Sequence, residues 1–374
     1  MKVLHVITGL AVGGAELQLR SILQHTRHDA EVLALYNAGD VASMITGDGP
    51  RVRDLGMSSN TQLSALPKLR ALIREGGYDV VHTHLYRACV YGKLAAKLAG
   101  TPVVVGTEHS IGETHLERRR MTAGVRALYL GTDLFAQATI AVSPTVADRL
   151  AAWGVRRGKI TMIPNGVDFD RVAFDPAARA RVRGEHGIDD RAHVIGLLGR
   201  LDPNKRFDMV IEAAAPLLGE GGKLLVVGDG AERARLEALA EQLGVRRHVI
   251  FAGERHDVSA MFSAFDLFVA SSAQETFGLS VLEALGNGMP VLYTTCPALA
   301  GVRTDRARQV PGEVDALRKE ITAEVTDRRS RMDVPVIREL YGIEAVTGRI
   351  DDLYERLGAR SGTPVAAREG GGVR

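Results

Sequence analysis

Short apolar runs alternate along the chain with longer segments that mix apolar and polar residues, which predicts strands followed by helices. In the first half, strands are expected near 2–8, 30–36, 79–83, 102–107 and 137–142. Helices are expected between them, near 14–26, 64–75, 87–99 and 144–153. Strands and helices that alternate in this way are typical of parallel, doubly wound α/β sheets.

The same pattern begins again at HVIGLLGR, residues 193–200. Further strands are expected near 223–227, 248–252, 266–270 and 290–294, and further helices near 206–218, 231–243, 257–264 and 278–287. The second half of the chain is therefore expected to form an α/β unit of its own.

The segment between the halves, IPNGVDFDRVAFDPAARARVRGEHGID, has little apolar period and several turn residues, so we expect the domain boundary there. The expected domains are 1–164 and 165–342. A last amphipathic helix is expected at 343–358. The tail 360–374 is Gly-rich and has no apolar period, which predicts disorder.

Composition narrows the class of protein. A length of 374 residues predicts two or three domains, and a formal net charge of +2 argues against nucleic-acid binding as the main task. No apolar run approaches the roughly 18–20 residues that span a bilayer, and the N-terminus lacks the pattern of a signal peptide. Cys89 and Cys296 do not form a disulfide framework, so we expect a cytoplasmic protein.

The stretch ETFGLSVLEALGNGMPV sets Glu275 in a loop and Glu283 on the helix that follows. Helical side chains lean toward the helix N-terminus, so Glu283 is expected to point back toward Glu275. The backbone N–H groups of Phe277, Gly278 and Leu279 begin the helix and form an anion site. Two Glu at this spacing are more often solvated helix charge, but the arrangement also fits a ligand with an anionic middle and hydroxyl groups on both sides.

Two cations follow the strand that begins the second half. Arg200 comes directly after Gly199, and Lys205 follows five positions later. Ligands of open α/β sheets bind at the carboxyl ends of the strands, where an Arg and a Lys suit a diphosphate. Surface charge is the more common interpretation of such a pair by itself.

Glycines at two strand-to-helix turns allow the backbone to approach a phosphate closely. They are Gly13 and Gly14 after the first strand, and Gly228 and Gly230 in VVGDGAERARL. The dinucleotide fingerprint Gly-x-Gly-x-x-Gly is absent, and a tight turn is the more common reason for either pair.

Three histidines lie at strand ends in the first half. His82 and His84 lie on one side of a strand, and His109 follows another strand. A zinc site needs a third ligand with suitable spacing, and the sequence shows none, so we expect no metal.

Together these motifs resemble the retaining GT-B glycosyltransferases of the Glu-x7-Glu type, the large family 4 group. The resemblance covers nearly the whole chain and is most specific in 193–294; Pro-Asn-Gly-Val-Asp also resembles the interdomain hinge of that family. It implies a GT-B architecture, with two Rossmann-like doubly wound parallel-sheet domains facing an interdomain cleft. It also implies that the helix at 343–358 packs back on the N-terminal, acceptor-side domain.

The resemblance also implies roles for single residues. Glu275 would read hydroxyls of the donor sugar, Arg200 and Lys205 would stabilise the departing diphosphate, and His109 would lie close to the reacting sugar. The remaining residues would bind the donor: Glu283 at the ribose, Gly13 and Gly14 beside the phosphate, Phe277, Gly278 and Leu279 at the helix start, and Gly228, Gly230, Glu254 and Arg255 around the nucleobase.

The chain departs from the family pattern at three points. Arg206 follows Lys205 where Gly is common, and Thr276 stands where Gly usually follows the first Glu. After Pro290 the chain reads VLYTTCPALAGV in place of a Gly-Gly stretch, so backbone contacts near Cys296 are expected to differ. These departures leave the sugar preference open.

The expected activity is transfer of a hexose from a nucleoside diphosphate sugar, with uridine as the base, to a hydroxyl acceptor with retention. No Asp-x-Asp motif is evident near a strand end, so no metal and no cofactor are expected. Exopolysaccharide, cell-envelope and natural-product acceptors remain open. Two alternatives are a sugar-nucleotide epimerase on the same two-domain frame and a non-catalytic nucleotide-sugar-binding subunit.

The run Arg118-Arg119-Arg120 is expected to be solvated surface, or else a contact with an anionic acceptor or the inner face of a membrane.

Overall fold

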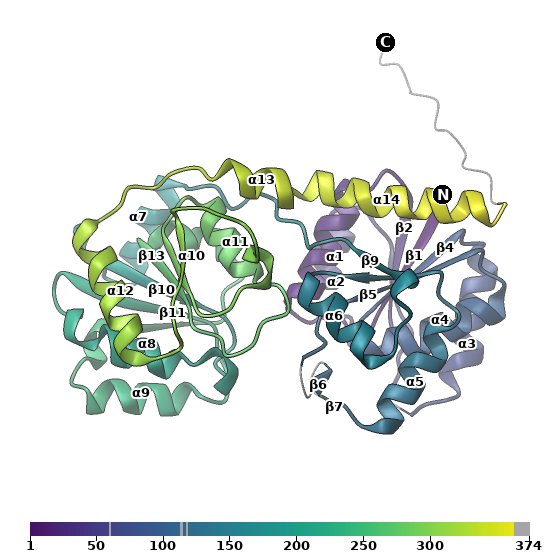
Figure 1. Ribbon diagram of the computed structural model, residues 1–374, viewed down its shortest axis with the longest axis horizontal. Coiled ribbons are helices and arrows are strands. Elements are labelled where there is room, and N and C mark those ends of the chain that lie inside the picture. The colour runs from purple at the N-terminus through teal and green to yellow at the C-terminus, as the bar shows by residue number, and fades with distance from the viewer. Residues whose placement is uncertain (60, 113–114, 117–118, 363–374) are drawn as a thin grey trace, which may run out of the picture. The chain divides into compact units, whose positions relative to one another are not determined.

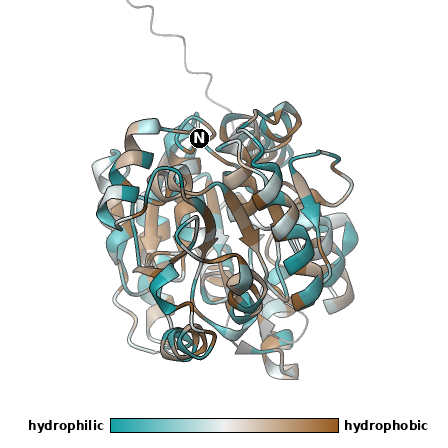
Figure 2. Cartoon of the chain, turned by 90° about the vertical axis from the view of Figure 1, so that its left-hand side faces the viewer, coloured by the Kyte–Doolittle hydropathy of each residue, from teal (hydrophilic) through white to brown (hydrophobic). Residues whose placement is uncertain are grey.

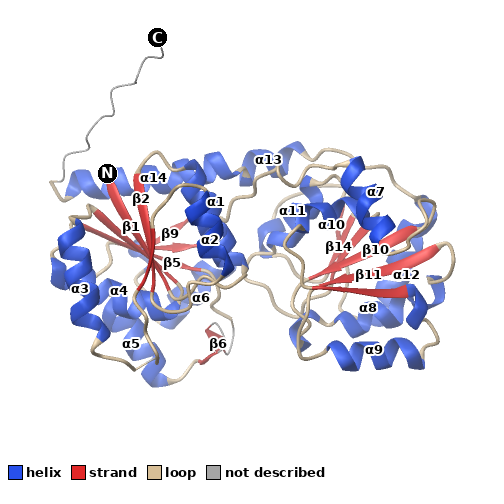
Figure 3. Ribbon diagram, turned by 180° about the vertical axis from the view of Figure 1, so that it is seen from behind, coloured by secondary structure: helices blue, strands red, loops and turns tan. Residues whose placement is uncertain are grey.

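The structure, a computed structural model, describes residues 1–59, 61–112, 115–116 and 119–362. It divides into two compact units, one formed by Met1–Gly166 with the segment from Ile343 onward, and the other by Val167–Gly342. Each unit has its own parallel sheet with helices packed around it (Figure 1; Figure 3). The expected disordered tail lies outside the described residues from 363 onward.

The first unit contains a seven-stranded sheet in the order β3-β2-β1-β4-β5-β8-β9, and every neighbouring pair is parallel. Its strands are β1 (Lys2–Ile7), β2 (Asp29–Ala34), β3 (Val52–Asp54), β4 (Val80–His84), β5 (Val103–Glu108), β8 (Ala138–Ala141) and β9 (Ile160–Met162). A separate antiparallel pair is formed by β6 (His115–Leu116) and β7 (Arg119–Arg120).

Seven helices among the described residues cover this first sheet. They are α1 (Gly14–His25), α2 (Asp40–Gly47), α3 (Ala65–Gly76), α4 (Tyr86–Ala99), α5 (Ala123–Asp133), α6 (Pro144–Trp153) and α14 (Ile343–Arg360). The last of these packs its apolar side onto the sheet, where Ile350 and Tyr354 share a buried cluster with Val3 and Val103. Burial of these side chains stabilises the attachment of α14, at about 1.5–3 kcal/mol for each fully buried large apolar side chain.

The second unit contains a six-stranded sheet in the order β12-β11-β10-β13-β14-β15, again with parallel pairs. Its strands are β10 (His193–Leu198), β11 (Gly222–Val227), β12 (Val249–Gly253), β13 (Leu267–Ala270), β14 (Val291–Tyr293) and β15 (Ala307–Gln309). Its helices are α7 (Pro176–Glu185), α8 (Phe207–Ala214), α9 (Arg233–Gln242), α10 (Val258–Ala264), α11 (Leu279–Gly286), α12 (Val314–Asp327) and α13 (Pro335–Tyr341). The strands are strongly hydrophobic, whereas the helices also carry hydrophilic residues (Figure 2).

Each sheet has one point at which the strand order reverses. In the first unit β2 and β4 lie on opposite sides of β1, and in the second unit β11 and β13 lie on opposite sides of β10. The carboxyl ends of parallel strands share one edge of a sheet, and ligands of such folds bind beside the reversal. The loops after β1 and β4, and after β10 and β13, are therefore the positions where a site is expected.

The alternation of strands and helices is confirmed, but the sequence patterns missed several elements. Neither β15, α12 nor α13 was expected after residue 294, and α7 lies in the segment that was expected to be irregular. Pro176 begins α7, and the carboxylate of Asp175 accepts hydrogen bonds from two backbone N–H groups of its first turn. One of its buried positions is Arg183, which hides the apolar period of the helix.

Arg183 is held in the core by an ion pair. Its side chain is 1% exposed, and its Nη2 lies 2.7 Å from Oδ2 of Asp266, which precedes β13. Arg183 also donates to the backbone carbonyls of Asp190 and Ala192, so its guanidinium has several acceptors. The pair therefore ties α7 to the sheet, because a buried guanidinium is tolerated only with its partners in place.

We expect Asp266→Asn to destabilise the protein by about 3 kcal/mol or more, because it leaves a buried cation without its counter-charge. Urea unfolding with circular dichroism measures the change. Arg181→Ala is the matched control, since Arg181 lies on the same helix and also pairs with carboxylates, but its side chain is 49% exposed. That control should lose about 1 kcal/mol or less. Equal losses in both variants would contradict this account of α7.

Candidate functional site

Asn204, in the loop after β10, makes several hydrogen bonds to the loop after β13. Its backbone carbonyl accepts from the N–H of Ala273 at 2.8 Å. Its side-chain amide bonds both the N–H and the carbonyl of Gln274, each at 3.0 Å. The two loops thus form one surface at the point where the strand order reverses.

This connection brings Lys205 and Glu275 together. Lys205 Nζ lies 2.8 Å from Glu275 Oε1, and both side chains are partly buried. The backbone carbonyl of Lys205 also accepts a hydrogen bond from the hydroxyl of Ser271 at 2.7 Å. Two residues that were predicted to act on one ligand, 70 positions apart in the chain, are therefore direct neighbours.

Arg200 lies on the same edge but is more exposed. Its side chain is 53% exposed, and its Nη1 is 3.9 Å from Oδ2 of Asp202. Asp202 in turn accepts hydrogen bonds from the N–H groups of Asn204 and Lys205, and so shapes the turn that carries the lysine. Arg200 is therefore the more accessible of the two cations, whereas Lys205 lies in a closer ion pair.

Arg206 shows how the chain tolerates the loss of the usual glycine after Lys205. It has a φ of +48° and a ψ of +41°, the left-handed conformation that glycine adopts most easily. This conformation costs a non-glycine residue roughly 1–2 kcal/mol. The left-handed turn after Lys205 is thus formed by an arginine.

The Gly-x-Gly turn after β11 has a packing role. A Cβ on Gly228 would lie 2.0 Å from the carbonyl oxygen of Gly199, and one on Gly230 would lie 2.3 Å from that of Leu201. The backbone N–H of Leu201 donates to the carbonyl of Asp229. These glycines therefore allow the loop after β11 to lie directly against the loop that carries Arg200.

Glu254 and Arg255 follow β12 on the same edge. Glu254 is exposed, whereas Arg255 lies in ion pairs with Asp257 at 2.8 Å and Glu185 at 3.1 Å. The guanidinium of Arg255 is therefore already paired with two carboxylates.

The start of α11 is built around Gly278. Its φ of +100° favours glycine, and a Cβ there would lie 2.5 Å from Sγ of Cys296. Phe277 is buried, with its ring 5.7 Å from that of Tyr341, and Leu279 begins the helix. Cys296, in the stretch that departs from the family pattern, thus packs against the helix end that was predicted to bind an anion.

Glu283 lies on the second turn of α11 and is partly buried. Burial raises the pKa of its carboxyl to about 7, although the nearby Arg171 lowers it. Near neutral pH the carboxyl therefore exists in both protonation states, so a ligand that needs the carboxylate must favour its ionisation.

The other predicted site residues belong to the first unit. Gly13 caps α1 with an extended φ of −167°, and Gly14 is the first residue of that helix. His109 directly follows β5, and its Nε2 lies 3.3 Å from Nδ1 of His84. Burial lowers the pKa of His109 to about 4, so the ring is neutral at neutral pH.

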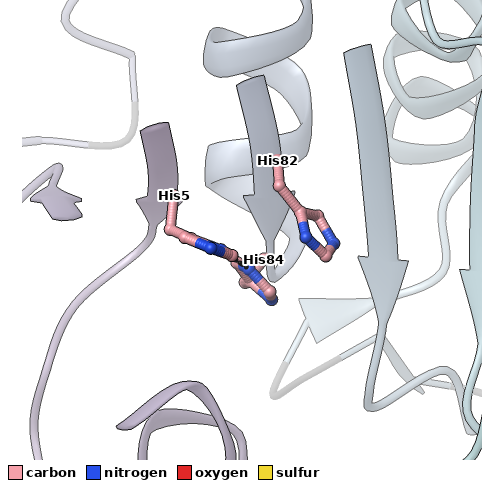
Figure 4. A group of neighbouring side chains, drawn as sticks. All are labelled: His5, His82 and His84. Carbon is pink, nitrogen blue, oxygen red and sulfur yellow. Dashed lines mark hydrogen bonds between the residues drawn. The ribbon is translucent and has the colours of Figure 1, made fainter. Parts of the chain in front are cut away.

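The sequence showed no third ligand with suitable spacing beside His82 and His84, but the fold places a third histidine there. His5 lies on β1, which pairs with β4 in the sheet. One ring nitrogen from each of His5, His82 and His84 lies within 4.8 Å of the other two (Figure 4). Sequence spacing could not show this, because the three residues meet only through strand pairing. Asn204 and Ser271 were missed for the same reason.

Comparison with known proteins identifies the family. The family model described as "Glycosyl transferases group 1" matches residues 178–334, and the one described as "Glycosyltransferase Family 4" matches residues 12–171. A "GDP-mannose-dependent alpha-mannosyltransferase" of Mycobacterium tuberculosis (strain CDC 1551 / Oshkosh) is 31% identical over 297 residues, 75% of each chain. The chain belongs to the group 1, family 4 glycosyltransferases.

A second sequence relative and a solved structure are also similar to this glycosyltransferase. The Escherichia coli "UDP-Gal:alpha-D-GlcNAc-diphosphoundecaprenol alpha-1,3-galactosyltransferase" is 29% identical over 244 residues, and the alignment spans 62% of each chain, less than two thirds of that relative. The crystal structure of Anabaena Alr3699/HepE in complex with UDP-glucose has a TM-score of 0.83 and 23% identity, and covers 95% of this chain and 100% of that one. The glycosyltransferase therefore has the GT-B fold.

Among the described residues of this glycosyltransferase, none of the helices has the length and apolar character to cross a bilayer. Arg118 of the basic run lies outside the described residues, as does the side chain of Arg119.

The free energy of unfolding of the Glu283→Gln variant should increase, relative to that of the unsubstituted glycosyltransferase, as the pH rises. The folded-state pKa of about 7 lies above the ordinary value of 4.5, so the stability gained by protonation is complete below about pH 4.5 and lost as the pH rises through 7. A glutamine needs no proton, so its advantage should grow by roughly 2 kcal/mol between pH 5 and pH 8.

Urea unfolding at both pH values measures this difference. The exposed Glu254 supplies the matched control, since Glu254→Gln should have the same small effect at pH 5 and pH 8. A Glu283→Gln effect that did not change with pH would show that burial does not hold this carboxyl in its neutral form.

Proposed function

We propose that this glycosyltransferase transfers a hexose from a nucleoside diphosphate sugar, with uridine as the base, to a hydroxyl acceptor, with retention of configuration and without a metal ion. The observation that carries the proposal is the pair formed by Lys205 and Glu275 beside the start of α11. A cation, a hydroxyl-accepting carboxylate and helix-end N–H groups are the three groups that a sugar diphosphate needs.

The lysine is arranged before the donor arrives. Its ammonium is held 2.8 Å from Glu275, so little reorganisation is needed when charge grows on the departing diphosphate. Arg200, which is more exposed, adds a planar set of donors for the same phosphates. These two cations would take the place of a divalent metal ion.

Glu275 can serve the lysine and the sugar at the same time. An ionised carboxylate has about four acceptor positions, of which the ammonium uses one. Hydrogen bonds from sugar hydroxyls to the remaining positions would orient the ring and stabilise the oxocarbenium-like transition state. In the same way Glu283 would accept hydrogen bonds from the ribose hydroxyls, which favours its ionised form.

The names of similar proteins support the proposed nucleoside diphosphate sugar donor and the proposed retention of configuration. One relative is named for UDP-Gal and a fold neighbour was crystallised with UDP-glucose, whereas another relative is named for GDP-mannose. Two are named for α-linked transfer. Transfer from an α-linked sugar nucleotide to an α-linked product retains configuration, and we extend this outcome to the present chain.

The acceptor that we favour is a cell-envelope or exopolysaccharide intermediate, met at the inner face of the membrane by a cytoplasmic enzyme. The galactosyltransferase relative is named for a lipid-linked acceptor, which is the reason for this choice. Soluble natural-product aglycones are the competing acceptors and belong in the same screen.

A single assay separates transfer from its two alternatives. The protein is incubated with UDP-glucose, UDP-galactose and GDP-mannose, each with and without a panel of lipid-linked and soluble acceptors. We expect an α-linked product, identified by NMR, only when an acceptor is present. Epimerised nucleotide sugar without acceptor would instead indicate an epimerase, and binding without turnover would indicate a binding subunit.

We expect uridine diphosphate to bind with the same affinity in the presence and absence of a chelator, because Arg200 and Lys205 would neutralise the diphosphate in place of a metal ion. Isothermal titration calorimetry in EDTA measures this affinity. Loss of binding in EDTA that is restored by Mg²⁺ or Mn²⁺ would overturn the metal-free mechanism.

Arg200→Ala and Lys205→Ala should each lower kcat roughly 100- to 1000-fold, with a smaller effect on donor binding, since their charges matter most when the bond to the diphosphate breaks. Arg235→Ala is the matched control, because that side chain is 58% exposed, against 53% for Arg200, and pairs with Asp208 and Glu232. The control should retain full activity. Full activity in either test variant, with unchanged thermal unfolding, would remove that residue from the mechanism.

A further inference from the structure

Segments that follow three strands of the first unit meet at Tyr36, two residues after β2. The backbone N–H of Tyr36 donates to the carbonyl of Thr8 at 3.2 Å, and the carbonyl of Asn37 accepts from the N–H of Leu10 at 3.0 Å. The loops after β1 and β2 are therefore joined beside the point where the strand order reverses. The third segment is the start of α4, after β4, which supplies Arg87. Its guanidinium carbon lies 4.3 Å from the centre of the Tyr36 ring.

The ring of Tyr36 lies on the outer side of this contact. Arg87 is 8% exposed and Tyr36 is 36% exposed, so the ring covers the guanidinium with one face and has its other face toward solvent. Among the described residues of the first unit, Tyr36 is the most exposed aromatic side chain. A cation–π contact holds the ring in one orientation before a ligand arrives. Such a ring can stack on the C–H face of a sugar.

The backbone on both sides of the ring has unusual features. A Cβ on Gly9 would lie 3.1 Å from the carbonyl oxygen of Tyr36 and 3.8 Å from Cε1 of its ring, so a side chain there would crowd the loop after β2. Leu85 has a φ of +71° and a ψ of +158°, a region that residues other than glycine rarely occupy, and leads the chain into the turn that carries Arg87. Such a conformation is kept only where the surrounding structure requires it.

A hollow of about 450 Å³ lies next to this ring on the same edge of the sheet. It is lined by Ala38, by α2 and by β3. The main chain from Tyr36 to Ala38 spans at most about 7 Å, so the ring and the hollow are close neighbours. The polar side chains of the hollow include Ser43, Arg53 and Asp54.

These polar groups suit an uncharged ligand with many hydroxyl groups. Arg53 already pairs with Glu31 at 3.2 Å, and Asp54 carries the opposite charge, so the hollow has no excess of positive charge that would attract a phosphate. The carboxylate of Asp54 accepts two backbone N–H groups, at 2.7 and 3.3 Å, and about two of its four acceptor positions remain. Sugar hydroxyls can donate to these positions, and the exposed hydroxyl of Ser43 can donate or accept.

We propose that the acceptor is an oligosaccharide chain, which stacks one sugar on Tyr36 and places a following sugar in the hollow beside β3. The strands β1, β2 and β3 are neighbours, so the edge from the reversal to the hollow extends over roughly 10 Å, more than a single hexose spans. This assignment deepens the proposed function and rests on it for the word acceptor. Binding of a free oligosaccharide does not depend on transfer.

Binding is measured first, because it needs no turnover. Oligosaccharides of glucose, of galactose and of mannose, each with one to four units, are titrated into the protein, and saturation-transfer difference NMR reports contact and affinity. We expect the affinity to rise with length in at least one series, with the monosaccharide at least tenfold weaker than the trisaccharide. Equal affinity for all lengths, or no binding in any series, would overturn the proposal.

Substitutions of Tyr36 test the stacking. Tyr36→Ala should weaken binding of the trisaccharide roughly tenfold, the cost of truncating an aromatic anchor, whereas Tyr36→Phe keeps the ring and should bind like the unsubstituted protein. Phe174→Ala is the matched control, because Phe174 is 39% exposed and has the guanidinium carbon of Arg331 4.2 Å from its ring centre, but lies in the second unit. Unchanged binding in a folded Tyr36→Ala variant, or an equal loss in the control, would overturn the role of Tyr36.

Ser43→Trp tests the hollow separately, since a large side chain at this exposed position of α2 fills it. The variant should lose the affinity gained with the longest oligosaccharides and keep that for the disaccharide. In the transfer assay, Tyr36→Ala and Ser43→Trp should raise the KM of long acceptors at least fivefold and leave the donor KM unchanged. Transfer that is independent of acceptor length and of Tyr36 would overturn only this assignment, whereas length-dependent binding in a protein without transfer would overturn only the proposed function.

Discussion

Contact between the loops after β10 and β13 is the constraint on which the second unit depends. The main chain and side chain of Asn204 bond the chain at Ala273 and Gln274, and this connection sets Lys205 beside Glu275. Parallel strands bring all their carboxyl ends to one edge, but only adjacent strands bring two loops into direct contact. The reversal of strand order between β10 and β13 makes these two loops adjacent.

The same edge contains an unfavourable backbone conformation and an unusual protonation state. Arg206 adopts a left-handed conformation directly after Lys205, and partial burial raises the pKa of Glu283 to about 7. Stability alone would favour a glycine and a neutral side chain at these positions. A fold keeps such features where a ligand makes use of them, and each lies beside a group that is proposed to bind the donor.

Buried polar groups in both units are tolerated because they have partners, but the partners differ in kind. Arg183 in the second unit is charged and faces the carboxylate of Asp266. In the first unit, burial lowers the pKa of His5, His82 and His84, and these rings bond one another or nearby hydroxyls, as His82 does with Tyr354 of α14. An ion pair therefore holds α7 in place, whereas hydrogen bonds between uncharged groups join the buried histidines.

The sequence by itself determined the alternation of strands and helices, the presence of two α/β units and the residues that follow each strand. Periodicity is a local property, so it is readable without knowledge of the fold, and Lys205, Glu275 and Glu283 stand out by their place after predicted strands. The local pattern failed at α7, because Arg183 occupies a buried position that is normally apolar.

Only the tertiary structure decided which of these residues meet. The contact of Lys205 with Glu275 depends on the pairing of β10 with β13, and that of His5 with His84 depends on the pairing of β1 with β4. Strand order is a property of the whole sheet and leaves no signal in the spacing of single residues. The protonation of Glu283 and His109 was hidden for a related reason, since burial is set by neighbours that are distant in the chain.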